Sequence, residues 1–272
     1  MSVSVLISTY YKEKPEWLDA SLHSIYTNQT RKPDEIVLVQ DGPLTPELQA
    51  VISTWKATLG DKLTIVVNEK NMGLAMSLNN GLKVAKGDII VRMDSDDIAY
   101  PERISKQVYF MEQHPDIDVV GSWVSEFIDT PENEISTRKV PELSEGIYEF
   151  GKSRNPMNHP SVTFRRDRVI EHGGYTHFWL FEDYCLWAQL LVKGYRFYNF
   201  QESLLWFRIS ADMFARRGGW KYAITEQKFQ FYLHGIGYIS FAMMLKNCII
   251  RFSGRIIPNS IRRFMYYRFM RR

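Results

Sequence analysis

Short apolar runs alternate with amphipathic segments along the first hundred residues. Runs rich in β-branched residues, typical of buried strands, cover 3–7, 36–39, 63–67 and 89–93. Segments with apolar residues at helical spacing lie between them, over 15–25, 45–59 and 74–85, and Thr45 followed by Pro46 is typical of a helix start. Strands that alternate with helices at this spacing predict an α/β fold, a mostly parallel sheet flanked by helices on both faces.

The middle of the chain has a less regular pattern. We predict a helix over 101–114, a strand over 117–121, a polar loop region with prolines over 129–160, a strand over 161–164, a helix over 183–193 and a late strand over 204–208. These elements would extend the α/β unit to residue 212.

The composition is that of a globular protein with a sizeable core, because 45% of the 272 residues are hydrophobic and 24% are charged. The two cysteines, Cys185 and Cys248, have no metal-ligand spacing, so neither a disulfide framework nor a zinc site is expected. The N-terminus lacks the pattern of a secretory signal. These features predict a cytoplasmic protein.

The net charge of +3 conceals an uneven distribution of charged residues. Residues 1–226 contain 25 basic and 31 acidic side chains, a net charge of −6, whereas residues 227–272 contain nine basic side chains and no acidic one. The acidic balance of the larger part disfavours nucleic-acid binding. We therefore treat 213–272 as a separate helical extension that is basic and rich in aromatic residues.

An apolar, uncharged run over 235–245 lies within this extension. It is too short to span a bilayer, which takes about 20 apolar residues. An apolar segment followed by arginines interleaved with aromatic residues favours association with an anionic membrane surface. The alternative is a C-terminal helix packed on the core.

Polar loops follow three of the predicted strands, over 9–11, 40–42 and 94–97. Ligands bind at the carboxyl edge of open α/β sheets. Asp94 and Asp96 are separated by one residue at a strand end, so both carboxylates would point into one cavity, where a cation is needed to offset their repulsion. Carboxylate oxygens suit Mg²⁺ or Mn²⁺. The alternative is an acidic cluster that stabilises the start of the next helix.

Further loop residues are compatible with nucleotide binding, each with a simpler alternative. Asp41 follows a strand, where an acidic side chain can accept a hydrogen bond from a base or ribose; an Asp-Gly turn is the alternative. Thr9 and Tyr10 either contact the base or are packed against the protein. Asn71 and Gly73 either bring backbone close to a ribose or phosphate or form an ordinary turn.

Several stretches, in this order along the chain, are similar to those of a known enzyme family: SVLISTYYKEKPEWLDASLHSI, DEIVLVQDG, NEKNMGLAMSLNNGL, GDIIVRMDSDDIAYPERISKQ, NHPSVTFRR, GGY and FEDYCLWAQLL. They span roughly residues 2 to 210. On these stretches the chain resembles family 2 glycosyltransferases, which have the Rossmann-like GT-A fold. The resemblance is strongest to bacterial enzymes of exopolysaccharide and O-antigen assembly of the amylovoran type.

The resemblance implies a nucleotide-diphosphate sugar donor, for which UDP is the nucleotide most often used in the family. It places Thr9, Tyr11 and Asp41 around the nucleoside. It also places Arg92 near the diphosphate, and Arg208, with Ser210, in a late family motif in which a basic residue approaches the diphosphate.

The resemblance makes the segment containing Asp94, Ser95 and Asp96 the motif that binds the metal and the diphosphate. The metal would be Mn²⁺ or Mg²⁺, with Asp94 and Asp96 as its candidate ligands. Asp96 would be the more direct ligand, and Asp97 a supporting carboxylate.

Glu182 and Asp183 fall where the family places its catalytic base, at the start of a helix that faces the acceptor. Asp183 is the preferred base of the two, since a carboxylate there can take the proton of an acceptor hydroxyl. The alternative is two acidic residues stabilised by a helix dipole. His159 and Trp179 are candidate acceptor contacts, with structural roles as their alternatives.

The implied activity is an inverting sugar transfer in the biosynthesis of a bacterial surface polysaccharide. Residues 1–100 would hold the nucleotide sugar, 101–212 the acceptor, and 213–272 would contact the inner face of the cell membrane. The tail and the family together favour a glycan acceptor on an undecaprenyl-diphosphate carrier. A non-catalytic nucleotide-sugar-binding protein of the same fold is the alternative.

Overall fold

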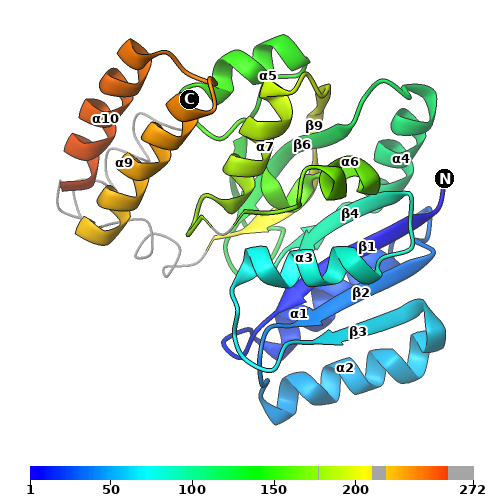
Figure 1. Cartoon of the computed structure of the whole chain (residues 1–272). Helices are drawn as coiled ribbons and strands as arrows, with labels where there is room; N and C mark the ends of the chain where they lie inside the picture. The colour runs from blue at the N-terminus through cyan, green and yellow to red at the C-terminus, as the bar shows by residue number, and fades with distance from the viewer. Residues whose placement is uncertain (177, 210–218, 257–272) are drawn as a thin grey trace.

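The structure, a computed structural model, describes residues 1–176, 178–209 and 219–256. In this part of the chain nine strands form one sheet in the order β3-β2-β1-β4-β8-β6-β9-β5, and β7 pairs with β6 (Figure 1). The strands are β1 (Val3–Thr9), β2 (Glu35–Gln40), β3 (Leu63–Val67), β4 (Ile89–Asp94), β5 (Ile98–Ala99), β6 (Val119–Phe127), β7 (Glu134–Arg138), β8 (Thr163–Arg165) and β9 (Phe197–Arg208).

Strands β1 to β4 are parallel and form the half of the sheet that the apolar runs predicted. Almost all residues of β1, β2 and β4 are buried, because helices cover both faces of the sheet, whereas β3 at the sheet edge is mostly half-buried. Strands β8 and β5 are antiparallel to their neighbours, while β6 and β9 are parallel to each other. The sheet is therefore mostly parallel, as the sequence predicted.

Helices pack on both faces of the sheet, each against its own set of alternate strand residues. Val5 and Ile7 of β1 belong to the core that α1, α2 and α4 cover, and Leu6 belongs to the core that α3, α5, α6 and α7 cover. The α-helices are α1 (Pro15–Leu22), α2 (Pro46–Leu59), α3 (Leu74–Val84), α4 (Arg103–Gln113), α5 (Ser144–Gly151), α6 (Arg166–Glu171) and α7 (Glu182–Val192). Short helical turns are η1 (His23–Thr27), η2 (Gly60–Lys62) and η3 (His159–Ser161).

Two helices, α9 (Gly219–Gly235) and α10 (Phe241–Ile256), form an antiparallel hairpin beside α7 (Figure 1). They confirm the predicted helical extension, and the predicted boundary at residue 212 lies outside the described residues. No helix in the described ranges has the length and apolar character needed to cross a bilayer.

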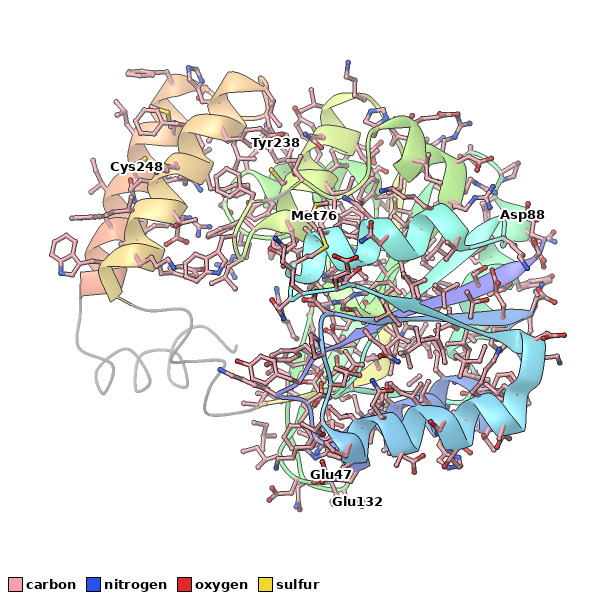
Figure 2. The ribbon with its side chains drawn as sticks, turned by 60° about the horizontal axis from the view of Figure 1, so that its bottom comes forward. Glu47, Met76, Asp88, Glu132, Tyr238 and Cys248 are labelled. Atoms are coloured by element: carbon pink, nitrogen blue, oxygen red, sulfur yellow. The ribbon has the colours of Figure 1, made fainter. Side chains whose placement is uncertain are left out.

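The apolar run over 235–245 does not form a continuous surface segment. Its centre, Tyr238 and Ile239, is buried in the turn between α9 and α10. Tyr238 lies between the hairpin and the body of the molecule, and its hydroxyl donates to the carbonyl of Tyr148 at 2.9 Å (Figure 2). Within this run Tyr238, Ile239 and Met244 therefore pack on the core, whereas Phe241 and Leu245 are exposed.

Most predicted elements of the first hundred residues are confirmed within a few residues. Thr45 caps α2, because its side-chain oxygen accepts the backbone N–H of Leu48 at 3.3 Å. The prediction of a loop over 129–160 was wrong, since that region contains β7 and α5. β7 is mostly polar and exposed at the sheet edge, so it lacks the alternation of a half-buried strand.

Two strands are longer than predicted: β6 continues to Phe127, and β9 begins at Phe197. The register of β9 against β6 jumps from Phe200 to Ser203, so Gln201 and Glu202 bulge out of the pairing. These exposed polar residues interrupt the apolar pattern, which explains why only the second half of β9 was predicted.

Candidate active site

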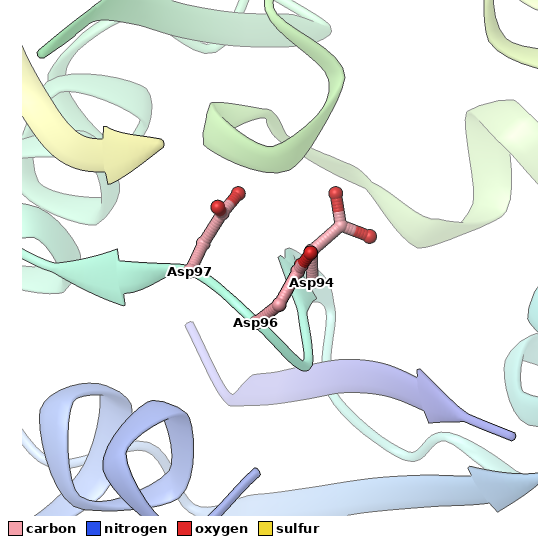
Figure 3. A group of neighbouring side chains, drawn as sticks. All are labelled: Asp94, Asp96 and Asp97. Carbon is pink, nitrogen blue, oxygen red and sulfur yellow. The ribbon is translucent and has the colours of Figure 1, made fainter. Parts of the chain in front are cut away.

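The acidic loop Asp94, Ser95, Asp96, Asp97 follows β4 at the carboxyl edge of the parallel strands. β1 pairs with both β2 and β4, so that Ser8 is opposite Asp94 and Thr9 is opposite Gln40. The ends of the three strands therefore meet at one edge, as predicted from their order. One carboxylate oxygen from each aspartate lies within 4.8 Å of the others, and all three side chains project from the same side of the loop (Figure 3).

Arg92 lies beneath this loop and is almost completely buried, with 1% of its surface exposed. Its Nη2 donates to Oδ1 of Asp94, while Nε and Nη1 have no hydrogen-bond partner among the described residues. Burial opposes its charge, but Asp94 and neighbouring charges outweigh burial and raise the pKa of Arg92. The loop thus rests on a permanent buried cation.

Arg208, the last residue of β9, reaches the same loop. Its Nε donates to the carbonyl of Asp96 at 2.8 Å, and its backbone N–H donates to Oδ1 of Asp97 at 2.8 Å. The guanidinium also stacks at 4.6 Å from the ring centres of Trp17 and Phe127. The structure therefore brings the two predicted arginines to the acidic loop from different strands.

The three carboxylates lie close together; Asp97 is buried, and Asp94 and Asp96 are partly buried. Burial, followed by the charges of Asp94 and Glu13, raises the pKa of Asp96 to about 7. Burial and the neighbouring Asp96 raise the pKa of Asp97 well above its usual range. An added cation would stabilise the ionised forms of these groups.

The residues present fit a divalent metal. The donor set consists of carboxylate oxygens, which hard cations such as Mg²⁺ and Mn²⁺ prefer. In addition, Oδ2 of Asp97 is buried and has no hydrogen-bond partner among the described residues. Such an atom is costly unless a further partner binds it.

Glu13, which the sequence reasoning missed, is part of this cluster. It lies in the loop after β1, and its Oε2 accepts a hydrogen bond from the Ser95 hydroxyl at 2.5 Å. Burial raises the pKa of Glu13, which Ser95 and Lys14 partly offset. Glu13 lies some residues beyond the end of β1, and its contact with Ser95, far away in sequence, is what makes it part of the cluster.

Asp41 ties two loops together. Its Oδ1 accepts the backbone N–H of Met72 at 2.7 Å and the side chain of Asn68 at 3.1 Å, and its Oδ2 accepts the backbone N–H of Gly73 at 3.0 Å. The side chain of Asn71 donates to the carbonyl of Asp41 at 3.3 Å. Asp41 therefore organises the loop that contains Asn71 and Gly73 at the edge of the sheet.

The backbone conformation at position 42, next to Asp41, requires a glycine. It has a φ of +87°, and a Cβ built there would lie 2.6 Å from the nitrogen of Asn71. The structure therefore shows the turn role of Asp41, and its contact with a nucleoside stays a prediction.

The residues after β1 line the same edge. Thr9 is buried, and its hydroxyl has no hydrogen-bond partner among the described residues. Tyr10 and Tyr11 are in edge contact with their ring centres 5.8 Å apart, and Tyr11 is half exposed. Both aromatic rings thus stand near the end of β1.

Glu182 and Asp183 begin α7, as predicted. Burial, followed by the charge of Asp183, raises the pKa of Glu182 to about 7, and Arg92 and Asp94 are close enough to contribute. Asp183 is held on both oxygens: Oδ1 accepts the backbone N–H of Tyr184 at 2.7 Å, and Oδ2 accepts Nδ2 of Asn155 at 2.6 Å. The start of α7 therefore lies near enough to Arg92 and Asp94 for their charges to act on Glu182.

The two candidate acceptor residues have different surroundings. His159 is buried, its Nε2 lies 3.1 Å from the hydroxyl of Tyr175, and burial together with Arg92 lowers its pKa well below the usual range. It is therefore a neutral histidine in the packing beneath the site. Trp179 is 41% exposed and has the ammonium of Lys221 4.6 Å from its ring centre, next to α9.

Comparison with known proteins agrees with this geometry. The sequence model described as glycosyl transferase family 2 matches residues 4–186. The chain belongs to this family. A protein of Escherichia coli named UDP-Gal:alpha-D-GlcNAc-diphosphoundecaprenol beta-1,3-galactosyltransferase is 39% identical over 99% of this chain and 96% of its own length. The amylovoran biosynthesis glycosyltransferase AmsE of Erwinia amylovora is 38% identical over 97% of both chains.

Solved structures show the same fold at low sequence identity. S. aureus TarS 1–349 in complex with UDP-GlcNAc has a TM-score of 0.66 and 17% identity, over 85% of this chain and 66% of that one. The mannosyltransferase PcManGT from Pyrobaculum calidifontis, in complex with GDP-Man and Mn²⁺, has a TM-score of 0.63 and 18% identity, over 95% of this chain and 77% of that one.

These relatives confirm the predicted GT-A fold and the predicted likeness to amylovoran-type family 2 enzymes. The protein is a glycosyltransferase, and the alternative of a non-catalytic binding protein has no support among relatives that match the chain over nearly its full length.

Proposed function

We propose that this glycosyltransferase is an inverting enzyme that transfers a hexose from a UDP-sugar to a hydroxyl of a lipid-linked glycan, in the biosynthesis of a bacterial surface polysaccharide. UDP-galactose and GlcNAc-diphosphoundecaprenol are the first substrates to test, because both appear in the name of the E. coli relative. The observation that supports the proposal is that Glu182, next to Asp183, is near enough to Arg92 and Asp94 for their charges to act on it, while Arg92 also pairs with Asp94.

The donor side of the proposed site is the carboxyl edge of β1, β2 and β4. Thr9, Tyr10 and Tyr11 would contact the nucleoside, with the loop that Asp41 organises. Arg92 and Arg208 supply positive charge near the acidic loop, where the diphosphate would lie. In this proposal residues 1–100 bind the donor and 101–212 form the acceptor side.

Asp94 and Asp96, with Asp97 in support, would hold Mn²⁺ or Mg²⁺. When bound, the metal offsets the charge that develops on the departing diphosphate. Ser95 and Glu13 hold the loop in shape through their hydrogen bond, and Arg208 fixes its far end through Asp97.

Asp183 is the proposed catalytic base. Its carboxylate takes the proton of the acceptor hydroxyl as the hydroxyl oxygen forms a bond to the anomeric carbon and the bond from that carbon to the diphosphate oxygen breaks. Attack opposite the leaving group inverts the anomeric configuration, so an α-linked donor gives a β-linked product. Glu182 is the neighbour of the proposed base and is not itself assigned that role. Its pKa of about 7 lets it exist in both protonation states near neutral pH.

The proposed location is cytoplasmic, at the inner face of the cell membrane, because a carrier-linked acceptor is confined to a bilayer. The basic balance of residues 227–272 supports this location. Trp179 remains a candidate for direct contact with the acceptor. His159 remains a candidate that acts on the acceptor indirectly, through its contact with Tyr175.

The decisive experiment is a binding and turnover screen of the purified protein against nucleotide sugars, with and without Mn²⁺ or Mg²⁺. We expect one donor to raise the melting temperature only with metal. Asp96→Ala should lose this shift, whereas Asp183→Ala should keep it without turnover. Asp167→Ala, at an exposed aspartate on α6, is the matched control and should behave as wild type. Failure of every nucleotide sugar to bind with either metal would refute the proposal.

A further inference from the structure

The outward side of the α9–α10 hairpin carries large apolar side chains that the fold does not bury. They recur at helical spacing on each helix and are 45% to 70% exposed. We define the hairpin face by six of them: Trp220, Ile224, Phe231, Phe241, Leu245 and Ile249. On both helices these positions lie along one side, because residues three, four or eleven apart point in similar directions.

The opposite side of each helix supplies the packing. On α9 the buried residues are Tyr222, Ala223, Glu226, Phe229, Gln230 and Leu233. The two helices are joined by hydrogen bonds from Asn247 to Gln230 at 2.9 Å and from Arg251 to Glu226. Two residues of the hairpin face also touch the other helix, since the ring of Trp220 lies 5.8 Å from that of Phe252 and the ring of Phe241 lies 5.8 Å from that of His234. Both nevertheless stay more than half exposed, so packing within the hairpin does not account for the face.

The charges around the hairpin face have one sign. Within residues 219–252 the exposed charged side chains are Lys221, Lys228 and Lys246. The acidic residue of this segment, Glu226, is buried and paired with Arg251. The sequence contains no acidic residue after Glu226. Within residues 219–252 the exposed charges beside the apolar face are thus all lysines, which complement the negative charge of an anionic lipid surface.

The hairpin is attached to the part of the molecule that holds the proposed base. The ring of Phe229 stacks on Phe181 with ring centres 4.6 Å apart, and the ring of Tyr222 lies 5.5 Å from Phe181. Phe181 directly precedes Glu182, the first residue of α7. The hairpin also lies on the side toward which the parallel strands point (Figure 1).

We propose that the hairpin face docks on an anionic lipid bilayer and thereby holds the start of α7 next to the membrane. The benefit to catalysis rests on the proposed lipid-linked acceptor, whereas the docking itself does not. A second copy of the chain fits this face less well, because a two-fold pairing of the hairpin faces would bring like-charged lysines together. Lipid phosphates instead complement those lysines, while the six apolar side chains enter the headgroup region.

The test uses the full chain and vesicles of phosphatidylcholine with or without phosphatidylglycerol, separated by flotation. We expect the wild type to float with the anionic vesicles and to be released by salt. The double variant Phe241→Ser/Ile249→Ser should bind about tenfold less or weaker still, and Lys228→Glu/Lys246→Glu should lose the preference for anionic vesicles. Tyr109→Ser, at a tyrosine on α4 that is 64% exposed, is the matched control and should float as wild type.

Melting curves of each variant establish that it is folded. Wild-type protein that stays off anionic vesicles, or equal flotation of the wild type and both double variants, would overturn the inference. So would a dimer in solution that Phe241→Ser/Ile249→Ser dissociates, since that result assigns the face to a second copy. Sugar transfer to a water-soluble acceptor, measured on the same proteins, separates the two proposals. If the wild type transfers sugar but does not float with anionic vesicles, only the docking proposal fails. If it floats but transfers no sugar, only the proposed reaction fails.

Discussion

Asn155 donates a hydrogen bond from Nδ2 to Oδ2 of Asp183 over 2.6 Å. Because the other oxygen of Asp183 accepts the backbone N–H of Tyr184, the plane of the carboxylate is held at the start of α7. Asn155 comes from the segment after α5, so the proposed base is oriented by a residue from another part of the chain. We infer that Asn155 is a positioning residue for Asp183.

Asn155→Ala should lower kcat by about 10- to 100-fold, because a base that is free to rotate spends less time within reach of the acceptor hydroxyl. The KM for the donor should stay unchanged, since Asn155 contacts no part of the acidic loop in the described hydrogen bonds. Steady-state kinetics with the donor varied provide the measurement. Ser153→Ala, at an exposed position of the same segment, is the control; an equal loss in that variant would argue against a positioning role.

Arg92→Met should destabilise the protein and increase its response to metal. The substitution removes the buried cation that pairs with Asp94, and loss of one partner of a buried ion pair costs about 3–5 kcal/mol. We expect less than this, because the side chain of Asp94 is 29% exposed. Mn²⁺ should then raise the melting temperature of Arg92→Met more than that of the wild type, since the carboxylates lack their internal cation. Arg92→Lys keeps a charge and should respond like the wild type; equal Mn²⁺ shifts in all three proteins would contradict this account.

The strand ends of the site were predictable from the sequence because they depend on local patterns. A run of β-branched residues predicts a strand, and a parallel order places the ends of β1, β2 and β4 at one edge, which brings Thr9, Asp41 and Asp94 together. The local pattern did not predict that Glu182 and Asp183 belong to the same site as that edge. That prediction came from the resemblance to a family, since the residues alone equally suit a helix start.

Glu13 and Asn155 were missed for a different reason. Each lies in a loop without periodic apolar residues, and its role depends on a side-chain contact with a residue far away in sequence, Ser95 or Asp183. Likewise, the pattern of the apolar run over 235–245 left open whether it lies on a membrane surface or packs on the core, and the structure buries Tyr238 in the turn of a hairpin while Phe241 and Leu245 stay exposed. Tertiary packing decides such contacts, and a single sequence does not encode them in any short pattern.

Glu182→Gln should be more stable than the wild type above neutral pH. The folded-state pKa of Glu182 is raised from 4.5 to about 7 by burial and by Asp183, so ionisation of Glu182 destabilises the folded protein. The two proteins should be equally stable below pH 4.5, diverge between pH 4.5 and 7, and keep a constant difference of up to about 3 kcal/mol above that range. Urea unfolding of the metal-free proteins across this pH range is the measurement. A difference in stability that does not change with pH would show that Glu182 is not buried as a protonated acid.

Arg208→Lys should weaken donor binding while leaving the fold intact. The guanidinium of Arg208 donates to the carbonyls of Asp96 and Asp129 at 2.8 and 2.6 Å and stacks between two aromatic rings, which the single ammonium of lysine cannot reproduce. The bond to Asp97 survives, because it comes from the backbone N–H of residue 208.

We therefore expect the melting temperature without ligands to change little and the KM for the donor to rise about tenfold, a loss of about 1.4 kcal/mol in binding. Arg168→Lys tests whether any arginine has this effect, since Arg168 is 48% exposed on α6 and pairs with Asp118 away from the loop. An unchanged KM in Arg208→Lys would mean that the acidic loop holds its shape through Asp97 alone. A large drop in the melting temperature would instead make Arg208 a residue of the fold and not of the donor site.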